Sequence, residues 1–119
     1  TYCASYCVSS LSIWISLNKA KAYQDNQGWS NGVPPSRMDD FVKHFYNNVT
    51  ISSGVNALSN ASPGKTIVTF RYENGSGNGH AAVFHYWSPG SEYVNMRDPQ
   101  NGNRLMLVHK DDIIKVYQK

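Results

Sequence analysis

The chain has 119 residues, a mass of 13.3 kDa and a formal net charge of +3, with 40% hydrophobic and 16% charged residues. This length supports one hydrophobic core, so we expect a single domain over residues 1–119, and the composition excludes a disordered or fibrous protein. The basic residues are scattered, and the longest apolar stretch, residues 8–17, is interrupted by serines and shorter than the roughly 20 residues that cross a bilayer. We therefore expect neither nucleic acid nor a membrane as a partner.

The N-terminal part of the chain has the pattern of two helices. A helix over about residues 3–18 is predicted by apolar residues that recur at helical spacing, namely Cys3, Cys7, Leu11 and Trp14. The next segment, "AYQDNQGWSNGVPPS", is rich in Gly, Asn and Pro and predicts a loop. Ser36 is the expected N-cap of a second helix that ends at "NNVTISSG". Its expected apolar face consists of Met38, Phe41, Val42 and Phe45.

From residue 65 onward the composition favours strands. The runs "KTIVTFRY", "HAAVFHYW" and "EYVNMRD" are separated by "ENGSGNG" and "SPGS", a pattern typical of an antiparallel meander. "GNRLMLVH" predicts a fourth strand, and "DDIIKVY" a short helix or strand. Helices first and strands second indicate the α+β class, with the N-terminal helix packed on an antiparallel sheet.

The two cysteines, Cys3 and Cys7, lie four residues apart on the first predicted helix. They point the same way and do not readily form a disulfide. Cys3 is in the first turn, where the helix dipole, about half an elementary charge, favours thiolate over thiol. Cys7 is one turn further along the buried stripe, where a thiol stays neutral. We predict that Cys3 reacts and Cys7 packs in the core.

A reactive thiol needs a histidine that accepts its proton and a carboxylate that orients the histidine. His80 begins one predicted strand and Asp98 ends the next. With "WSPGS" as the connecting loop, Tyr86 faces Glu92, and His80 faces Asp98 on the same side of the sheet. A register shift of one residue would separate them. The sequence therefore predicts a triad of Cys3, His80 and Asp98.

The other histidines have weaker claims to a role. His85 is at odd spacing from His80 and is expected on the opposite face of the strand, as a structural residue. His44 and His109 are expected at the surface. "ENGSGNG" joins strand to strand rather than strand to helix, so we interpret it as a hairpin loop and not as a phosphate cradle.

A zinc site formed by Cys3, Cys7, His80 and Asp98 is the alternative use of the same residues. A CxxxC pair without a second Cys or His cluster matches the usual zinc-ligand spacings poorly. We therefore expect no metal and no cofactor.

The order Cys, His, Asp resembles the papain-like cysteine peptidase superfamily. "YCASYCVSSL" resembles the nucleophile helix of staphopain-type peptidases and of bacteriocin double-glycine leader peptidases, in which the first cysteine is the nucleophile. "GHAAVFHYW", "YVNMRDPQNG" and "RLMLVHKDDIIKVY" are similar to their His strand, Asp-Pro-x-x-Gly turn and closing segment, and also to papain-fold toxin and deamidase domains. The resemblance covers both ends of the chain and hardly includes residues 19–62. It implies a papain-like fold.

One feature of these families is missing. They usually place a glutamine several residues before the nucleophile to help form the oxyanion hole, but this chain begins two residues before Cys3. Either the domain is excised from a longer protein, or the second oxyanion donor comes from elsewhere. The backbone N–H of Cys3 and the side chain of Gln100 are the candidate donors.

The resemblance implies a thiol hydrolase. Cys3 would attack a carbonyl carbon, His80 would act as general base and then general acid, Asp98 would orient His80, and water would resolve the thioester. The carbonyl could belong to a peptide bond, as in a cysteine peptidase, or to a glutamine side chain, as in a deamidase or transglutaminase-like toxin. A catalytically inactive papain-like module that binds a peptide is the third alternative.

The same resemblance sets expectations about partners and location. It implies a protein or peptide substrate and an inhibitor or immunity protein as binding partners. It also implies a protein that is secreted, or delivered as part of a larger exported protein.

Overall fold

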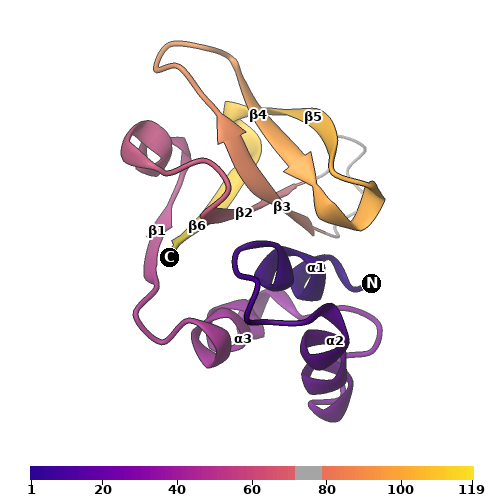
Figure 1. Cartoon of the computed structure of the whole chain (residues 1–119). Helices are drawn as coiled ribbons and strands as arrows, with labels where there is room; N and C mark the ends of the chain where they lie inside the picture. Colours follow the sequence, from indigo (N-terminus) through magenta and orange to yellow (C-terminus); the bar gives the residue numbers. More distant parts are fainter. Residues whose placement is uncertain (72–78) are drawn as a thin grey trace.

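The computed structural model describes residues 1–71 and 79–119. In this part of the chain, the helices α1 (Cys3–Ser10), α2 (Leu17–Asn26) and α3 (Met38–Phe45) pack below a six-stranded sheet (Figure 1). The strands are β1 (Thr50–Ser53), β2 (Thr66–Arg71), β3 (Gly79–Tyr86), β4 (Tyr93–Asp98), β5 (Arg104–His109) and β6 (Ile113–Gln118). All neighbouring strands are antiparallel, so the predicted α+β class is confirmed.

The first predicted helix is in fact two helices. α1 ends at Ser10 and α2 begins at Leu17, so the single helix over residues 3–18 was wrong. Serines explain the break, because their side chains compete with helical hydrogen bonding and favour caps and turns. The Ser16 hydroxyl caps α2 by accepting a hydrogen bond from the backbone N–H of Lys19 at 3.1 Å. Trp14, predicted on the buried stripe, is 85% exposed.

The second predicted helix begins slightly later than expected. Ser36 lies inside the 3₁₀ turn η1 (Pro35–Arg37) and is not an N-cap, and α3 follows from Met38. Its buried side chains, Met38, Phe41 and Val42, belong to the predicted apolar face. The predicted loop over residues 22–36 is shorter than expected, because α2 continues to Asn26.

The sheet contains the predicted meander and two strands that complete it. The order is β1-β6-β2-β3-β4-β5, so β6 inserts between β1 and β2. The segment "DDIIKVY", predicted as a short helix or strand, thus contributes to the strand β6. β1 lies within "NNVTISSG", the segment in which the second predicted helix was expected to end. The 3₁₀ turns η2 (Val55–Asn60), η3 (Pro99–Asn101) and η4 (Lys110–Asp112) connect strands. The predicted hairpin loop "ENGSGNG", apart from Gly79, lies outside the described residues, as does Tyr72 of the first predicted strand.

The register of β3 on β4 differs from the prediction. Val83 pairs with Arg97, and a bulge then places Tyr86 opposite Asn95 instead of Glu92. In the regular part of the ladder the difference is two residues, which leaves every side chain on its predicted face. His80 is therefore on the same face as Asp98, although the two are not directly paired.

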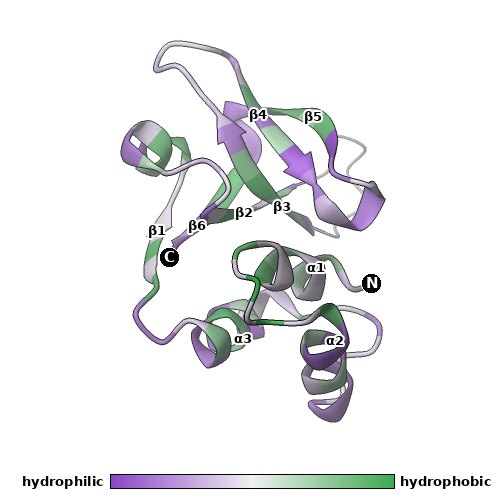
Figure 2. Ribbon diagram, in the orientation of Figure 1, coloured by the Kyte–Doolittle hydropathy of each residue, from purple (hydrophilic) through white to green (hydrophobic). Residues whose placement is uncertain are grey.

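The sheet has a hydrophobic cluster on each face. The cluster on the helix side includes Cys7, Val8, Phe41, Ile67, Val83 and Tyr117. The cluster on the other side includes Val68, Phe70, Phe84, Val94, Met96 and Val116. Adjacent residues of β2 belong to opposite clusters, as the two-residue period of a strand requires. Figure 2 shows β2 and β3 mostly as hydrophobic ribbon and the outer turns of α2 as hydrophilic.

An ion pair and a tyrosine join α3 to β6. The Tyr117 hydroxyl donates to Asp39 Oδ1 at 2.6 Å, and Lys115 Nζ donates to both carboxylate oxygens at 3.1 and 2.8 Å. Burial would raise the pKa of Asp39, but the hydrogen bonds from Lys115 and Tyr117 outweigh it and lower the pKa. A carboxylate with a lowered pKa stabilises the fold above its unfolded pKa, and this contribution is lost as the pH falls through the folded value.

We expect Tyr117→Phe to lower the free energy of unfolding by about 2 kcal/mol at pH 7, because it removes a hydrogen bond to a charged group. Urea denaturation measures the change. Tyr86→Phe is the matched control, since Tyr86 is 58% exposed, and should stay within about 0.5 kcal/mol of the parent. The difference between the variants should shrink in acid, where Asp39 is protonated. Equal stabilities at pH 7 would contradict this role of Tyr117.

Candidate active site

The N-terminal end of α1 meets the sheet where β3 begins. α1 packs against β3 and against η3, the turn that follows β4. Cys3 is the first residue of α1, His80 the second residue of β3, and Asp98 the last residue of β4. The three predicted site residues thus come from three elements that meet at one end of the sheet.

The Cys3 thiol lies against His80 and the backbone of β3. Burial alone would raise the pKa of Cys3, but a hydrogen bond to His80, the charge of that ring and the backbone N–H of Ala81 together lower it. The residue as a whole is partly exposed, in contrast to Cys7. Its position at a helix N-terminus also favours the thiolate.

His80 connects the thiol to Asp98. Its ring is 8% exposed, and its Nε2 lies 3.0 Å from Asp98 Oδ2. An ionised carboxylate only accepts hydrogen bonds, so Nε2 carries a proton and Nδ1 is the nitrogen that exchanges a proton with Cys3. Burial lowers the pKa of His80, but the interactions with Cys3 and Asp98 outweigh it and raise the pKa. Both shifts favour a proton on His80 and a thiolate on Cys3.

Asp98 is held as an ion by the turn that follows it. Asn101 Nδ2 donates to Asp98 Oδ2 at 2.7 Å, and the backbone N–H of Gln100 donates to Oδ1 at 3.2 Å. Burial would raise the pKa of this carboxyl, which is 3% exposed, but the hydrogen bonds from Asn101 and His80 outweigh it and lower the pKa. Asp98 therefore orients the imidazole without taking its proton.

The turn itself needs two residues in left-handed backbone conformations. Gly102 has φ 69° and Asn103 has φ 60°, a region that glycine and asparagine tolerate best. They reverse the chain so that the Asn103 N–H donates to the Asp98 carbonyl at 2.9 Å. The sequence "DPQNGN" thus supplies both the carboxylate and its support.

Asn101 was missed at the sequence level, although the Asp-Pro-Gln-Asn spacing was the available signal. The residue predicted to act from this turn was Gln100, whose side chain was a candidate for the second oxyanion donor. The structure places Gln100 in η3, the turn that packs on α1, and uses its backbone N–H to hold Asp98. Its side chain as an oxyanion donor stays a prediction, as does the backbone N–H of Cys3.

Cys7 has the opposite environment to Cys3. It is fully buried and packs in the cluster on the helix side of the sheet. Burial raises the pKa of its thiol well above the ordinary value, and the negative charges of Cys3 and Asp98 add to the effect. Both cysteines are free thiols. Cys3 contacts His80 and Cys7 packs in the core, so their environments differ in the direction that the sequence predicts.

Gln24 is a second residue that the sequence did not indicate, because residues 22–36 were predicted to form a loop, whereas α2 continues to Asn26. Its amide is fully buried: Oε1 accepts from the Ser5 hydroxyl at 2.7 Å, and Nε2 donates to the carbonyls of Thr1 and Trp29 at 2.9 and 2.8 Å. These bonds tie the backbone before Cys3 to α2. Both N–H groups of the amide already have acceptors, so Gln24 has none left to donate in an oxyanion hole.

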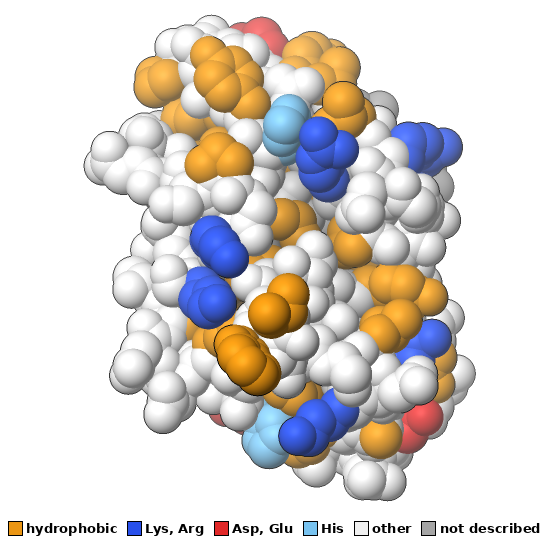
Figure 3. Space-filling view, in the orientation of Figure 1, with side chains coloured by type: hydrophobic (Ala, Val, Ile, Leu, Met, Phe, Trp, Pro, Cys, Tyr) orange, Lys and Arg blue, Asp and Glu red, His pale blue; other side chains and the backbone are white. Residues whose placement is uncertain are grey.

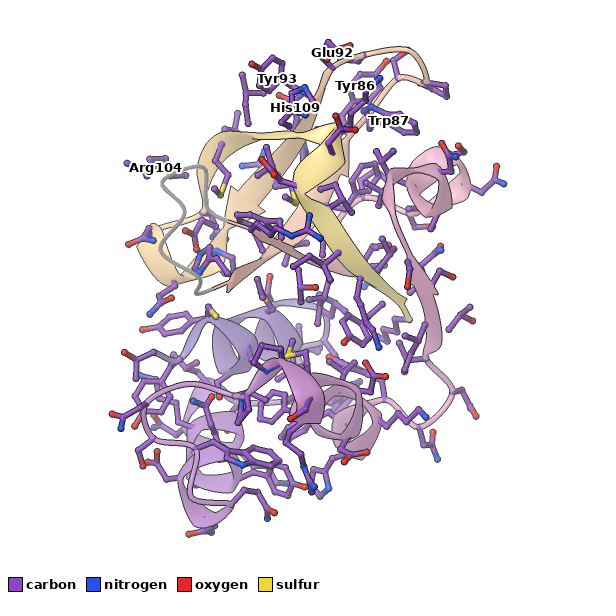
Figure 4. All side chains as sticks on the ribbon, turned by 180° about the vertical axis from the view of Figure 1, so that it is seen from behind. Tyr86, Trp87, Glu92, Tyr93, Arg104 and His109 are labelled. Carbon is purple, nitrogen blue, oxygen red and sulfur yellow. The ribbon has the colours of Figure 1, made fainter. Side chains whose placement is uncertain are left out.

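The remaining histidines lie away from this site. His109 is beside Glu92 and Tyr93 at the end of the sheet furthest from α1 (Figure 4), and its Nε2 lies 2.9 Å from Glu92 Oε2. His44 is exposed, as expected, and stacks on Tyr23 with ring centroids 3.7 Å apart. His85 is half-buried in β3.

In the described ranges, 1–71 and 79–119, no group of three or more His, Cys, Asp or Glu side chains is arranged to hold a metal ion. No protein-family model matches the chain, and a search of curated proteins finds no match. A functional assignment therefore rests on the site. Its chemistry is that of an ionisable thiol, a histidine that can accept and return a proton, and a fixed carboxylate.

Alkylation with iodoacetamide tests the environment of the thiols. A thiol with a lowered pKa is ionised at lower pH, so we expect Cys3 to be labelled at pH 6 faster than an unperturbed thiol of pKa about 8.5, and Cys7 to stay unlabelled until unfolding. In His80→Ala, burial still raises the pKa but the two largest opposing interactions, both with His80, are gone, so labelling of Cys3 should move to higher pH. Peptide mapping after labelling measures both.

His109→Ala is the matched control for this experiment, because His109 lies at the other end of the sheet, and it should leave the pH profile of Cys3 unchanged. Preferential labelling of Cys7, or a His80→Ala profile equal to that of the parent, would contradict the assignment.

Replacement of Gln24 tests the anchor of the N-terminal segment. Gln24→Ala leaves a buried hydroxyl and two carbonyls without their partner, so we expect a loss of about 2 to 3 kcal/mol in the free energy of unfolding. Gln27→Ala, an exposed glutamine after the end of the same helix, should stay within about 0.5 kcal/mol. Thermal and urea unfolding measure the stability of both variants. Similar losses in the two variants would contradict the role of the buried Gln24 amide as an anchor.

Proposed function

We propose that the protein is a papain-like thiol hydrolase, a cysteine peptidase with Cys3 as nucleophile, His80 as proton carrier and Asp98 as the residue that orients His80. One observation carries the proposal: the imidazole of His80 contacts the Cys3 thiol and, through Nε2, lies 3.0 Å from the Asp98 carboxylate. The resemblance of the sequence motifs around these residues adds support. So does the position of the thiol at the start of a helix.

In the first half-reaction, the Cys3 sulfur attacks the carbonyl carbon of the substrate. A C–S bond forms, and the carbonyl π electrons move to oxygen. The helix N-terminus, including the Cys3 N–H, faces the developing negative charge. His80 then gives its Nδ1 proton to the leaving nitrogen as the C–N bond breaks. The amine departs, and the acyl group remains on sulfur as a thioester.

In the second half-reaction, water replaces the amine. His80 Nδ1 takes a proton from the water as its oxygen attacks the thioester carbon, and the tetrahedral intermediate collapses with cleavage of the C–S bond. The carboxylic acid product leaves, and the proton on His80 pairs again with the Cys3 thiolate. Asp98 stays ionised in both halves, because its hydrogen bonds stabilise the carboxylate.

The expected experiment follows turnover of a peptide library by mass spectrometry, together with ammonia release from glutamine-containing proteins. Peptide cleavage generates new termini, whereas attack on a glutamine side chain releases ammonia from the same acyl-enzyme. We expect Cys3→Ala, His80→Ala and Asp98→Ala, which removes the acceptor of the Nε2 proton, each to lower kcat/KM by roughly 10³-fold or more. An acyl adduct on Cys3 should be visible in acid-quenched reactions of the parent protein.

Cys7→Ala is the matched control and should keep activity while it remains folded, since Cys7 is buried and lacks a thiolate at neutral pH. Unchanged turnover in Cys3→Ala would refute the proposal. Peptide binding without turnover, equal in the parent and Cys3→Ala, would identify the domain as an inactive binding module.

A further inference from the structure

The turn between α1 and α2 exposes two large hydrophobic side chains. Ile13 is 92% exposed and Trp14 85% exposed, the highest values among the exposed large hydrophobic residues of the described chain. Single exposed apolar residues are ordinary, but two adjacent ones at the tip of a turn form a compact apolar protrusion. Leu11, two residues before Ile13, is buried, so the apolar side chains of this segment differ sharply in exposure.

Hydrogen bonds hold this turn in shape. The Ile15 N–H donates to the Ser12 carbonyl at 3.3 Å, and the Trp14 N–H donates to the Ser12 hydroxyl oxygen at 3.2 Å. The Ser9 hydroxyl donates to the Ile15 carbonyl at 2.9 Å. These hydrogen bonds hold the backbone on both sides of Ile13 and Trp14. The conformation of the turn therefore keeps the two side chains exposed.

Two lysines flank the protrusion. Lys65 Nζ and Lys119 Nζ both donate to the Leu11 carbonyl, at 3.3 and 3.4 Å, so two ammonium groups meet at the carbonyl end of α1. That end of a helix carries partial negative charge, which accounts for their approach. Both side chains are exposed, and an ammonium group has three donors, so each lysine can bind a further acceptor.

Several segments around the turn contain no acidic residue. Residues 1–24, 41–71 and 113–119, which include the turn and both lysines, contain no Asp or Glu. Figure 3 shows the face on which this turn is nearest the viewer. Hydrophobic and basic side chains lie side by side over the middle of that face, and acidic side chains appear only toward its margins. The face thus combines an apolar tip with basic side chains.

We propose that this face binds the surface of an anionic membrane, with Ile13 and Trp14 inserted at the level of the lipid headgroups and Lys65 and Lys119 against lipid phosphates. Tryptophan favours the membrane interface, and lysines near an anionic leaflet strengthen binding. No helix of the described residues has the length and hydrophobicity to cross a bilayer. This proposal departs from the expectation that a membrane is not a partner; the contact that it proposes lies at the membrane surface.

The turn and the candidate thiol lie at opposite ends of α1. The turn follows the C-terminal end of α1 and Cys3 begins its N-terminal end, about 12 Å away for a helix of this length. The proposal does not depend on hydrolase activity.

The test is sedimentation of the protein with vesicles of phosphatidylglycerol and phosphatidylcholine, compared with vesicles of phosphatidylcholine alone. We expect binding to the anionic vesicles at low salt, weaker binding in high salt, and a blue shift of tryptophan emission. Trp14→Phe should keep most of the binding and lose the blue shift, because it removes the inserted indole but retains an aromatic ring.

The double variant Ile13→Ser/Trp14→Ser should bind anionic vesicles at least about tenfold more weakly. Lys65→Gln/Lys119→Gln should also lose about tenfold or more, since each lysine contributes about fivefold. Leu105→Ser/Leu107→Ser is the matched control, because these residues of β5 are 54% and 60% exposed, and it should bind as the parent does. Circular dichroism checks that each variant is folded.

Three results would overturn the proposal. The first is failure of the parent protein to bind anionic vesicles at low salt. The second is equal binding by the Ile13→Ser/Trp14→Ser variant. The third is concentration-dependent self-association that this variant abolishes without any vesicle binding by the parent, which would assign the protrusion to contact with a second copy of the chain. Cys3→Ala should bind vesicles as the parent does, so failure of the hydrolase proposal would leave this one standing.

Discussion

The contact of α1 with the start of β3 is the constraint on which the candidate site depends. It brings the thiol of Cys3 to the imidazole of His80, and the antiparallel pairing of β3 with β4 brings that imidazole to Asp98. Each residue then changes the ionisation of its neighbours: the thiol becomes more acidic, the imidazole more basic, and the carboxylate stays charged. Displacement of α1 by one helical residue would remove the thiol from this chain of contacts.

Two polar clusters, one buried and one part-buried, hold the helices next to that contact. Gln24 joins α2 to the backbone before Cys3, and Asp39 joins α3 to β6 through Lys115 and Tyr117. Buried polar groups are costly unless satisfied, so such clusters favour one arrangement over near alternatives of similar hydrophobic burial. The apolar clusters on the two faces of the sheet supply bulk stability, whereas these polar contacts determine where the helices sit.

The sequence predicts the strands well, because strand alternation and turn residues are local signals. The predicted placement of His80 and Asp98 on one face of the sheet survives an error in register, since the two-residue difference at Val83 leaves His80 on the same face. The helical half is predicted less well. Ile13 and Trp14 continue the apolar run of α1, so hydrophobic periodicity alone extends the helix through a turn that serines create. Gln24 acts through contacts with distant parts of the chain that no local pattern reveals, whereas the Asp-Pro-Gln-Asn spacing is a local signal for Asn101.

The position of β6 has a consequence for how the molecule is made. β6 is formed by residues 113–118 and lies between β1 and β2, two strands that are synthesised well before it. Until it is in place, both have an unpaired edge, the state in which strands are most prone to associate wrongly. The sheet therefore closes only after synthesis has passed Gln118, and its many long-range pairings predict slow folding for a small protein. Among the described strands β1 pairs with β6 alone, so β1 joins the sheet only once residues 113–118 have been made.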